Sequence, residues 1–256
     1  MTPHSQLLPI TAAATVLLSL VFGLAGQDLP AEKKPYARTG QEASLVGYIT
    51  FTGKPPKPLQ IDMSADPSCY DHISNLKTEW FVVRNGRIAN VLVYVTSDTL
   101  NNYAFEMPSS EVVLAHKNCR YEPHILGLRV GQSLSIVNSD ETQHNTHPTP
   151  RANAEWSQTQ VGGGPPIIKT FQNAEAAIPF KDNQHPWEKA YVGVFTHPFF
   201  AVTDMDGNYR IDGLPPGSYK VTAWHERLGE KVFDLVVAPG ESRYVEFTFS
   251  TAEAKR

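Results

Sequence analysis

The chain has 256 residues, of which 41% are hydrophobic and 19% charged; this is enough apolar material for one or two buried cores and excludes an intrinsically disordered chain. Its 22 Lys and Arg residues against 26 Asp and Glu leave a formal net charge of −4. Because no dense basic run accompanies this balance, nucleic acid is not an expected partner.

The first 26 residues predict export. A continuous apolar run starts near Ile10, precedes the first strongly charged side chain, Asp28, and ends in small residues such as Gly23 and Ala25 that suit cleavage. No Lys or Arg precedes the run, and it is close to the length that spans a bilayer, so an uncleaved N-terminal membrane anchor is the second interpretation. Both interpretations place the protein in the periplasm or cell envelope, with a membrane contacted only through this segment.

Cys69 and Cys119 are the two cysteines of the chain. In an exported protein they most simply form one disulfide, which would close a loop of about 50 residues and stabilise the fold by about 3–4 kcal/mol in the chain-entropy model. A role as metal ligand is the alternative, although neither cysteine stands in a Cys-x-x-Cys or Cys-x-x-His spacing.

Short β-strands separated by Gly, Pro, Asn and Asp clusters dominate the rest of the chain. Asn85-Gly86, between two β-branched runs, is a strong hairpin signal within residues 80–96. The other predicted strands are 44–53, 133–138, 191–195, 218–224, 231–237 and 243–249. After the first segment no helical apolar period persists, so we predict an all-β protein of the sandwich or barrel type. Residues 149–166 are expected to form a long surface loop that exposes Trp156 beside a site.

Two stretches resemble a known family. NSDETQHNTHPTP (138–150) resembles the end of a cupredoxin strand that delivers a His-Asn pair to copper. The stretch that begins DNQHPWEKAYVGVF (182–226) resembles the copper loop of a plastocyanin-like family, often labelled methylamine utilization protein, in which Cys-x-x-His-Pro-Trp-Met precedes a carboxypeptidase-regulatory-like β-sandwich. DGNYRIDGLPPGSYKVTAW is also similar to the middle domain of rhamnogalacturonan lyases, which suggests at most an accessory carbohydrate-binding role.

The resemblance implies a cupredoxin-like Greek-key sandwich combined with a prealbumin-like or carboxypeptidase-regulatory-like β-sandwich. We expect N-terminal β-strands at 44–104, a cupredoxin-like region at 105–201 and a regulatory-like β region at 202–250. The opening and closing strands look like two parts of one sandwich, so the cupredoxin-like region is predicted to be inserted between them or packed against them.

Carried over residue by residue, the resemblance implies that His144 and His185 are imidazole ligands. Asp182 stands at the position of the family's cysteine and Glu188 at that of its methionine. Since thiolate ligation gives a blue copper centre its character, a blue electron-transfer site is not expected. Two imidazoles with one or two carboxylates still suit copper as non-blue Cu(II), or another divalent metal such as Zn(II) or Fe(II). The alternative is a metal-free loop in which Asp182 and Glu188 are solvated charges.

Other chemistry-bearing residues receive structural interpretations. His147, three residues after His144 on a strand, is expected on the opposite face. His124 is expected to be packed and hydrogen-bonded, while His197 and His225 are expected to flank a junction of the two β units. The pair Asp140/Glu141 is expected to be solvated. DMDGN (204–208) has the outline of a calcium loop but is interpreted as a hairpin turn.

No nucleophile elbow, phosphate-binding glycine loop or zinc-protease motif is present in the sequence, so we do not expect an enzyme. The favoured function is an exported cupredoxin-like protein that binds a divalent metal through His144, His185, Asp182 and Glu188. The alternative is a metal-free envelope module that binds a protein or a polysaccharide. An enzyme with a mononuclear non-blue site is the least favoured.

Overall fold

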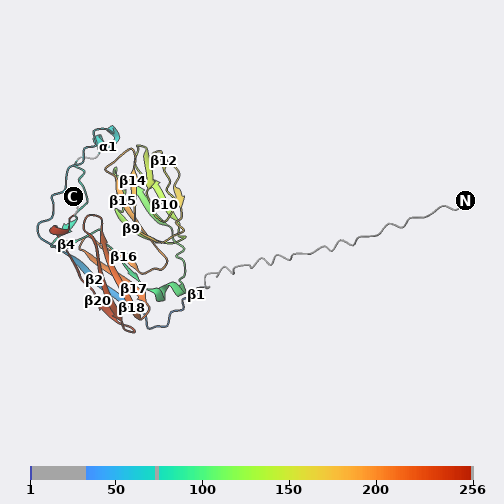
Figure 1. The fold of residues 1–256 in the computed structure, drawn as a ribbon. Coiled ribbons are helices and arrows are strands. Elements are labelled where there is room, and N and C mark those ends of the chain that lie inside the picture. The colour runs from blue at the N-terminus through green and yellow to red at the C-terminus, as the bar shows by residue number, and fades with distance from the viewer. Residues whose placement is uncertain (2–32, 73–74, 255–256) are drawn as a thin grey trace. The chain divides into compact units, whose positions relative to one another are not determined.

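The computed structural model describes Met1, residues 33–72 and residues 75–254. The predicted export or anchor segment, 1–26, lies outside the described residues apart from Met1. Within the described part, the helices are α1 (Pro67–His72) and two short 3-10 turns, η1 (Asp98–Asn102) and η2 (Thr251–Glu253). None of these helices is long and apolar enough to span a bilayer. The predicted all-β fold class is confirmed, and the strands form two sandwiches (Figure 1).

Strands from both ends of the sequence build the first sandwich, which we call the terminal sandwich (residues 43–52, 83–96 and 200–250). One of its sheets has the strand order β16-β5-β18-β19; the other has the order β17-β2-β4-β3, with β20 and β21 also paired to β2. Its strands are β2 (Ala43–Thr52), β3 (Val83–Arg84), β4 (Arg87–Ile88), β5 (Leu92–Thr96), β16 (Phe200–Val202), β17 (Asn208–Leu214), β18 (Gly217–His225), β19 (Gly229–Val237), β20 (Ser242–Tyr244) and β21 (Phe247–Ser250).

The core of the terminal sandwich follows the two-residue period of its strands. In β2 the side chains of Ala43, Leu45, Ile49 and Phe51 are buried, and they pack in one cluster with the inward side chains of β17 and β18. Successive side chains of a strand point to opposite faces, so alternation of apolar and polar residues is enough to bury one face of each sheet. Strands before residue 97 therefore share one core with strands after residue 199.

Residues 112–195 form the second sandwich, which we call the middle sandwich. Its sheets have the orders β13-β10-β7-β8 and β12-β11-β14-β15-β9. The strands are β7 (Val112–His116), β8 (Tyr121–Glu122), β9 (Ile125–Arg129), β10 (Leu134–Asn138), β11 (His144–Pro148), β12 (Gln158–Gln160), β13 (Ile167–Lys169), β14 (Glu175–Asp182) and β15 (Lys189–Phe195). The pairs β7/β10 and β9/β15 are parallel, whereas β14 is antiparallel to both β11 and β15. A separate parallel pair joins β1 (Lys34–Pro35) to β6 (Tyr103–Ala104).

The predicted hairpin at Asn85-Gly86 is confirmed. Both turn residues have positive φ, 50° and 73°, and Arg84 pairs with Arg87 across a two-residue connection. Asn-Gly favours this turn because both residues tolerate the left-handed region at little cost. The DMDGN segment is likewise a turn, in which Asp204 accepts hydrogen bonds from the backbone N–H groups of Asp206 and Asn208.

Part of the loop prediction for 149–166 is wrong. Residues 158–160 form β12, an edge strand antiparallel to β11. Trp156 is half-buried rather than exposed: its ring meets Phe180 edge to face, and the ammonium group of Lys169 lies 4.7 Å from the ring centre. Pairing with β11 and packing on the core order this segment, and neither contact is visible in its polar sequence.

The two sandwiches share an apolar junction inside a single compact unit that starts at Lys33. Leu92 and Tyr94 of the terminal sandwich cluster with Ile125 and Phe195 of the middle sandwich. Gly127 of β9 allows the close approach, since a Cβ atom there would lie 2.5 Å from the ring of Phe200 in β16. The junction is therefore packed too tightly for an added methyl group.

One end of the middle sandwich is covered by a segment that we call the cap (residues 60–72 and 75–77). The cap contains α1, which lies beyond the ends of the strands of the middle sandwich in Figure 1. The predicted disulfide between Cys69 and Cys119 is present and ties the cap to the turn after β7. Met63 and Leu76 of the cap are buried with the two cysteines, and Trp187 packs against this cluster.

Candidate metal centre

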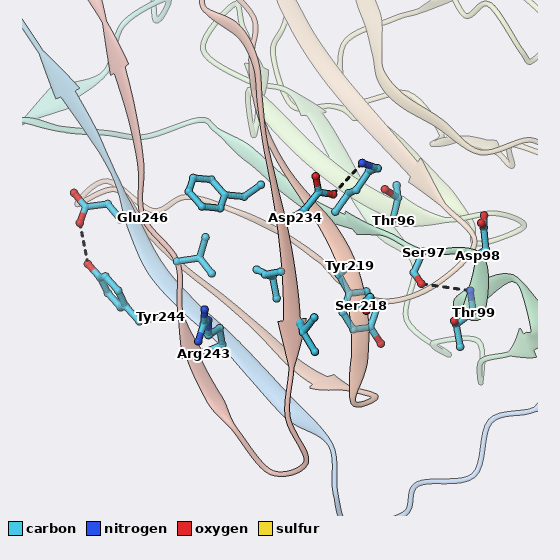
Figure 2. A pocket seen from close by; sticks show the side chains of 15 residues that line it. Thr96, Ser97, Asp98, Thr99, Ser218, Tyr219, Asp234, Arg243, Tyr244 and Glu246 are labelled. Atoms are coloured by element: carbon cyan, nitrogen blue, oxygen red, sulfur yellow. Dashed lines mark hydrogen bonds and ion pairs between the residues drawn. The ribbon is translucent and has the colours of Figure 1, made fainter.

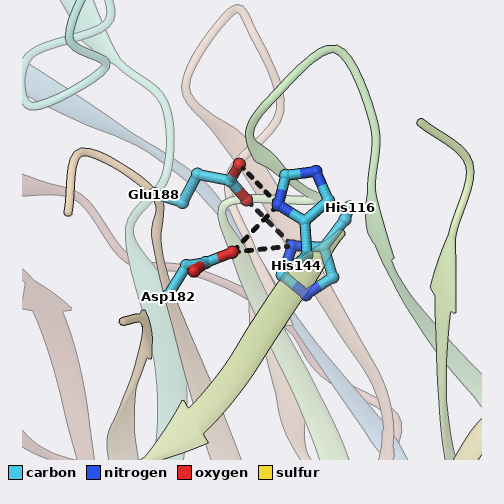
Figure 3. A group of neighbouring side chains, drawn as sticks. All are labelled: His116, His144, Asp182 and Glu188. Carbon is cyan, nitrogen blue, oxygen red and sulfur yellow. Dashed lines mark hydrogen bonds and ion pairs between the residues drawn. The ribbon is translucent and has the colours of Figure 1, made fainter. Parts of the chain in front are cut away.

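Four buried side chains that can hold a metal ion converge beneath the cap: His116, His144, Asp182 and Glu188. We call them the inner group. His116 is the last residue of β7, His144 the first of β11 and Asp182 the last of β14, while Glu188 lies in the turn that leads to β15. Figure 3 shows the two imidazole rings facing the two carboxylates. Strand ends that are far apart in sequence thus bring the inner group to one end of the sandwich.

The ligand atoms of the inner group lie close to one another. His144 Nδ1 is 2.9 Å from Asp182 Oδ2 and 3.1 Å from Glu188 Oε1. His116 Nδ1 is 2.9 Å from Glu188 Oε2 and 3.8 Å from Asp182 Oδ2. All four side chains are shielded from solvent, with 0% side-chain exposure. In each of the two imidazoles Nδ1 is the nitrogen that faces the carboxylates.

His185 lies at the edge of the inner group. Its Nδ1 is 3.2 Å from Asp182 Oδ2 and 3.8 Å from Glu188 Oε1, and its ring centre is 4.5 Å from that of His144. The structure therefore brings together all four residues predicted from the sequence, His144, His185, Asp182 and Glu188.

Sequence reasoning missed His116. Its ring stacks on that of His144, with centres 4.4 Å apart and planes inclined by 11°. The signal in the sequence was its place at the end of the apolar run EVVLAH. The sequence analysis did not predict the strand that this run forms. Only the parallel pairing of β7 with β10 carries this strand end to the loop that precedes His144.

The alternative in which Asp182 and Glu188 are solvated loop charges is wrong. Counted over the whole residue, backbone included, the exposed fractions of Asp182 and Glu188 are 3% and 1%. Asp182 Oδ1 accepts hydrogen bonds from the backbone N–H groups of Gln184 and His185, so the turn after β14 folds around this carboxylate. Burial of two carboxylates requires positive charge or hydrogen-bond donors nearby, because an unpaired charge in a protein interior is costly.

The outward nitrogen of each histidine also has a partner. His116 Nε2 is 2.9 Å from Thr146 Oγ1, His144 Nε2 is 3.1 Å from Asp140 Oδ2, and His185 Nε2 is 2.8 Å from Asp66 Oδ2. When the outward N–H donates to such an oxygen, the lone pair of Nδ1 points at the centre of the group. Metal-binding histidines are oriented in the same way by an oxygen acceptor on their second nitrogen.

Charges at this end of the sandwich are strongly coupled. Burial opposes the charged form of His144, but hydrogen bonds to Asp140 and Asp182 and the charge of Glu188 outweigh it and raise the pKa of His144 to about 11. Burial likewise opposes ionisation of Asp182, and hydrogen bonds from His144 and His185 nevertheless hold the pKa of its carboxyl well below the usual range. In the absence of a metal ion, protons on His144 and His185 balance the buried carboxylate of Asp182, because the pKa values of both histidines are raised, despite burial, by their hydrogen bonds to it.

The donor set fits a metal ion. Ligand atoms about 2.0–2.2 Å from a tetrahedral ion lie roughly 3.4 Å apart, and the contacts within the inner group are 2.9–3.8 Å. Glu188 Oε1 is buried and, despite its distance of 3.1 Å from His144 Nδ1, accepts no hydrogen bond of good geometry from a described residue. A buried carboxylate oxygen without a donor is the kind of atom that a cation satisfies.

The remaining histidines take structural roles. His147 is half-buried on the face opposite His144 and contacts Asn183 and Glu155, as the strand period predicts. His124 is packed and hydrogen-bonded as expected, through the Lys189 carbonyl and Glu226. His197 and His225 are buried, and each ring lies among aromatic rings, including Phe199 for His197 and Phe81 for His225.

The prediction that Asp140 is merely solvated is wrong. Its carboxylate is hydrogen-bonded to the backbone N–H groups of Asn118 and Cys119 as well as to His144. Since Cys119 is bound to Cys69, neither cysteine offers a thiolate to a metal in this structure.

A separate groove lies on the terminal sandwich, between β19 and β20. Figure 2 shows its lining, which includes Asp234 and Tyr244. Asp234 forms an ion pair with Lys220 at 2.9 Å. Phe233 and Val236 are exposed along the same strand, β19. The groove shares no residue with the inner group.

Comparison with known proteins supports the regulatory-like part of the fold. Residues 181–250 match the family model of the carboxypeptidase regulatory-like domain. The matched segment starts at the end of β14 and runs through β21, so it includes Asp182, His185 and Glu188. The match confirms a carboxypeptidase-regulatory-like component of the fold, and it begins at residue 181 rather than at the predicted residue 202. No curated protein matches the chain.

Several similar solved structures are copper proteins, and the similarity is partial. A Cu-containing nitrite reductase from Thermus scotoductus SA-01 is 17% identical with a TM-score of 0.32, over 35% of this chain and 23% of the reductase. Amicyanin from Paracoccus versutus is 20% identical with a TM-score of 0.30, over 35% of this chain and 85% of amicyanin. A purple cupredoxin from Nitrosopumilus maritimus is 17% identical with a TM-score of 0.28, over 33% and 99%. The chain thus spans less than a quarter of the reductase.

Proposed function

We propose that this chain binds one divalent transition-metal ion through His116, His144, Asp182 and Glu188, with His185 beside them. The observation that supports the proposal most directly is the buried atom Glu188 Oε1, which accepts no hydrogen bond of good geometry from a described residue. It lies beside His144 Nδ1, and the other nitrogen of this ring already contacts an oxygen acceptor. A cation at the centre would satisfy Glu188 Oε1 and replace the protons that otherwise separate imidazoles from carboxylates.

The chemistry of the donors indicates the class of metal. Imidazole nitrogen and carboxylate oxygen suit Cu(II), Zn(II) and Fe(II), and the thiolate that a blue copper site requires is not among these donors. A bound ion would supply positive charge to a region that holds four carboxylates. These are Asp66, Asp140, Asp182 and Glu188.

Burial of the inner group favours retention of an ion over turnover of a substrate. The four side chains are closed off by the cap, and a catalytic metal keeps an open coordination position. We therefore propose a non-enzymatic metal-handling protein of the periplasm or cell envelope. The disulfide between Cys69 and Cys119 supports an oxidising compartment, because such bonds are rare in reducing ones.

The test is metal content and titration of the purified protein with Cu(II), followed by EPR and absorption. We expect one ion per chain, a nitrogen and oxygen EPR signal and no strong visible thiolate band. Glu188→Gln should weaken binding by about 100-fold or more, since loss of a ligand should cost at least as much as the 10–100-fold typical of its supporting residues. Glu226→Gln is the matched control, because Glu226 is a buried carboxylate paired with a histidine away from the inner group.

Metal content no higher in the wild-type protein than in Glu188→Gln would refute the proposal. The function would then be sought in the alternative, a metal-free envelope module. Binding of the metal-stripped protein to a protein or a polysaccharide would support that alternative.

A further inference from the structure

The disulfide lies close to two histidines of the metal centre, His185 and His144. One Cys sulfur, that of Cys69, lies within 4.8 Å of ligand atoms of Asp66 and His185. The sulfur of Cys119 lies within the same distance of ligand atoms of Asp140 and His144. The bond between the two sulfurs therefore joins two groups of the same composition, each with one aspartate, one cysteine and one histidine.

Each aspartate holds its cysteine and its histidine together. Asp66 Oδ1 is 2.8 Å from the backbone nitrogen of Ser68 and 3.4 Å from that of Cys69, while its Oδ2 accepts from His185 Nε2 at 2.8 Å. The side chain of Thr142 donates to the same Oδ2. Asp66 therefore fixes the start of α1, the cysteine that follows it and the outward face of His185 in one place.

The second group repeats this arrangement on the other side of the disulfide. Asp140 Oδ1 accepts from the backbone N–H of Asn118 at 2.7 Å, and Oδ2 accepts from that of Cys119 at 2.9 Å. Oδ2 is also 3.1 Å from His144 Nε2. Both cysteines are buried, with exposed fractions of 0% and 2%. Each sulfur lies within 4.8 Å of a ring nitrogen of its histidine, so neither would need to move far to share a metal ion with it.

We propose that the disulfide masks a second metal site, and that its reduction creates a centre of two thiolates and two imidazole nitrogens from Cys69, Cys119, His144 and His185. Two thiolates with two imidazoles form the donor set of tetrahedral structural zinc sites, and thiolates also favour Cu(I). The ligand is therefore a soft or borderline metal ion, in contrast to the nitrogen and oxygen preference of the inner group. This site would stand even if the inner group bound no metal.

The two sites would use opposite nitrogens of the shared histidines. For the thiolate site the lone pair of Nε2 must face outward, which places the remaining proton on Nδ1. Asp182 Oδ2 is positioned to accept that proton, at 2.9 Å from His144 Nδ1 and 3.2 Å from His185 Nδ1. A carboxylate that accepts from the second nitrogen is the usual support of a metal-bound histidine. Asp182 would thus be a metal ligand in the inner group and a positioning residue, which orients the two histidines, in the thiolate site.

Reduction of the disulfide requires a reductant such as a phosphine or a dithiol. A phosphine and one water convert the disulfide into two thiols and the phosphine oxide; a dithiol does the same and becomes a disulfide itself. The two thiols then bind a divalent ion as thiolates and release two protons, and each protonated imidazole that becomes a ligand releases one more. A small-molecule disulfide reverses the sequence by thiol–disulfide exchange: it is reduced to two thiols while the Cys69–Cys119 bond forms again, which removes both sulfur ligands.

The test is anaerobic titration of the phosphine-reduced protein with Co(II), which gives a strong near-ultraviolet charge-transfer band only when thiolates are bound. We expect this band in the reduced wild-type protein and not in the oxidised one. It should be lost in Cys69→Ser/Cys119→Ser and retained in Glu188→Gln, which removes a ligand of the inner group but keeps both sulfurs and both histidines of the thiolate site. His185→Gln should weaken the binding that produces the band by about 100-fold. Zn(II) should protect both thiols of the wild-type protein from alkylation.

Absence of the band in a reduced protein with native circular dichroism would overturn the proposal. So would an unchanged Co(II) affinity in His185→Gln, because the thiolates would then act without the histidines. If reduction unfolds the chain, Zn(II) must restore the native spectrum, and failure to do so counts against the site. Failure of the band in Glu188→Gln together with loss of Cu(II) binding would instead point to a shared structural defect, and the two-site description would be abandoned.

Discussion

Replacement of Asp182 by asparagine tests the buried centre without any assumption about metal. Asp182 Oδ2 contacts His144 Nδ1, His185 Nδ1 and the backbone nitrogen of Asn145. Its Oδ1 accepts from two further backbone N–H groups, those of Gln184 and His185. Asparagine keeps the shape but offers one oxygen acceptor, and its NH₂ group would face donors. The substitution removes the charge that the two imidazoles share and leaves several buried donors without an acceptor.

The expected cost follows from the burial of the pair. Removing one partner of a buried ion pair typically costs about 3–5 kcal/mol, because the other charge stays buried and unpaired. In a domain of 150–250 residues each kcal/mol lowers the unfolding midpoint by roughly 2–4 °C, so Asp182→Asn should lower it by roughly 6–20 °C. The loss should be measured in the presence of a chelator, so that it reports the metal-free protein.

The matched control is Asp234→Asn on the surface of the terminal sandwich. Asp234 pairs with Lys220 at 2.9 Å, but its side chain is 75% exposed. Surface substitutions of this kind change stability by about 0.5 kcal/mol or less. Thermal denaturation followed by circular dichroism compares the two variants directly. If Asp182→Asn shifts the midpoint no more than Asp234→Asn, Asp182 is not the buried charged centre described above.

Three further outcomes are expected. Thr146→Val should weaken metal binding about 10–100-fold in a titration, because the outward nitrogen of a ligand loses its partner, whereas Thr203→Val, which removes a buried hydroxyl of the terminal sandwich, should leave the affinity unchanged. Glu226→Gln should lower the free energy of unfolding by about 3–5 kcal/mol near pH 6. Burial opposes the charged form of His124, but hydrogen bonding to Glu226 outweighs it and raises the pKa of His124 above 6.5, so this loss of stability should shrink as the pH rises through that pKa. An equally large loss at high pH, measured by urea unfolding, would contradict this. Gly127→Ala should cost about 1–3 kcal/mol through overpacking at the junction, and an unchanged midpoint would mean that the two sandwiches are not packed as described.

Local patterns were sufficient for the strands whose own residues favour extended backbone. Asn85-Gly86 predicted its hairpin because the preference for positive φ belongs to the two residues themselves. β14 was missed: its sequence EAAIPFKD contains two alanines and a proline, and the strand is interrupted by an irregular register between Glu175 and Ile178. Pairing with both β11 and β15 makes it a strand despite weak propensity.

Burial of the loop charges could not be predicted from the sequence. In the sequence, Asp182 and Glu188 look like solvated residues beside a turn. Nothing in the residues next to them distinguishes a buried carboxylate from an exposed one. The cap supplies the difference, because Asp66 lies more than a hundred positions earlier in the sequence than His185, with which it shares a hydrogen bond at 2.8 Å. His116 was missed because the pairing of β7 with β10, which joins segments distant in sequence, brings it to the loop before His144.

By itself, the sequence predicted the all-β class, the disulfide and four residues of the candidate centre. These depend on strand periodicity, on the number of cysteines and on two short stretches, 138–150 and 182–226, that resemble a copper-binding family. The tertiary structure alone decided that His116 lies beside His144, that Asp182 and Glu188 are buried, and that Cys69 and Cys119 lie close to His185 and His144. The physical reason is that parallel strand pairing and the cap bring together segments that are far apart in the sequence. The charge balance and the positions of the ligand atoms arise only where those segments meet.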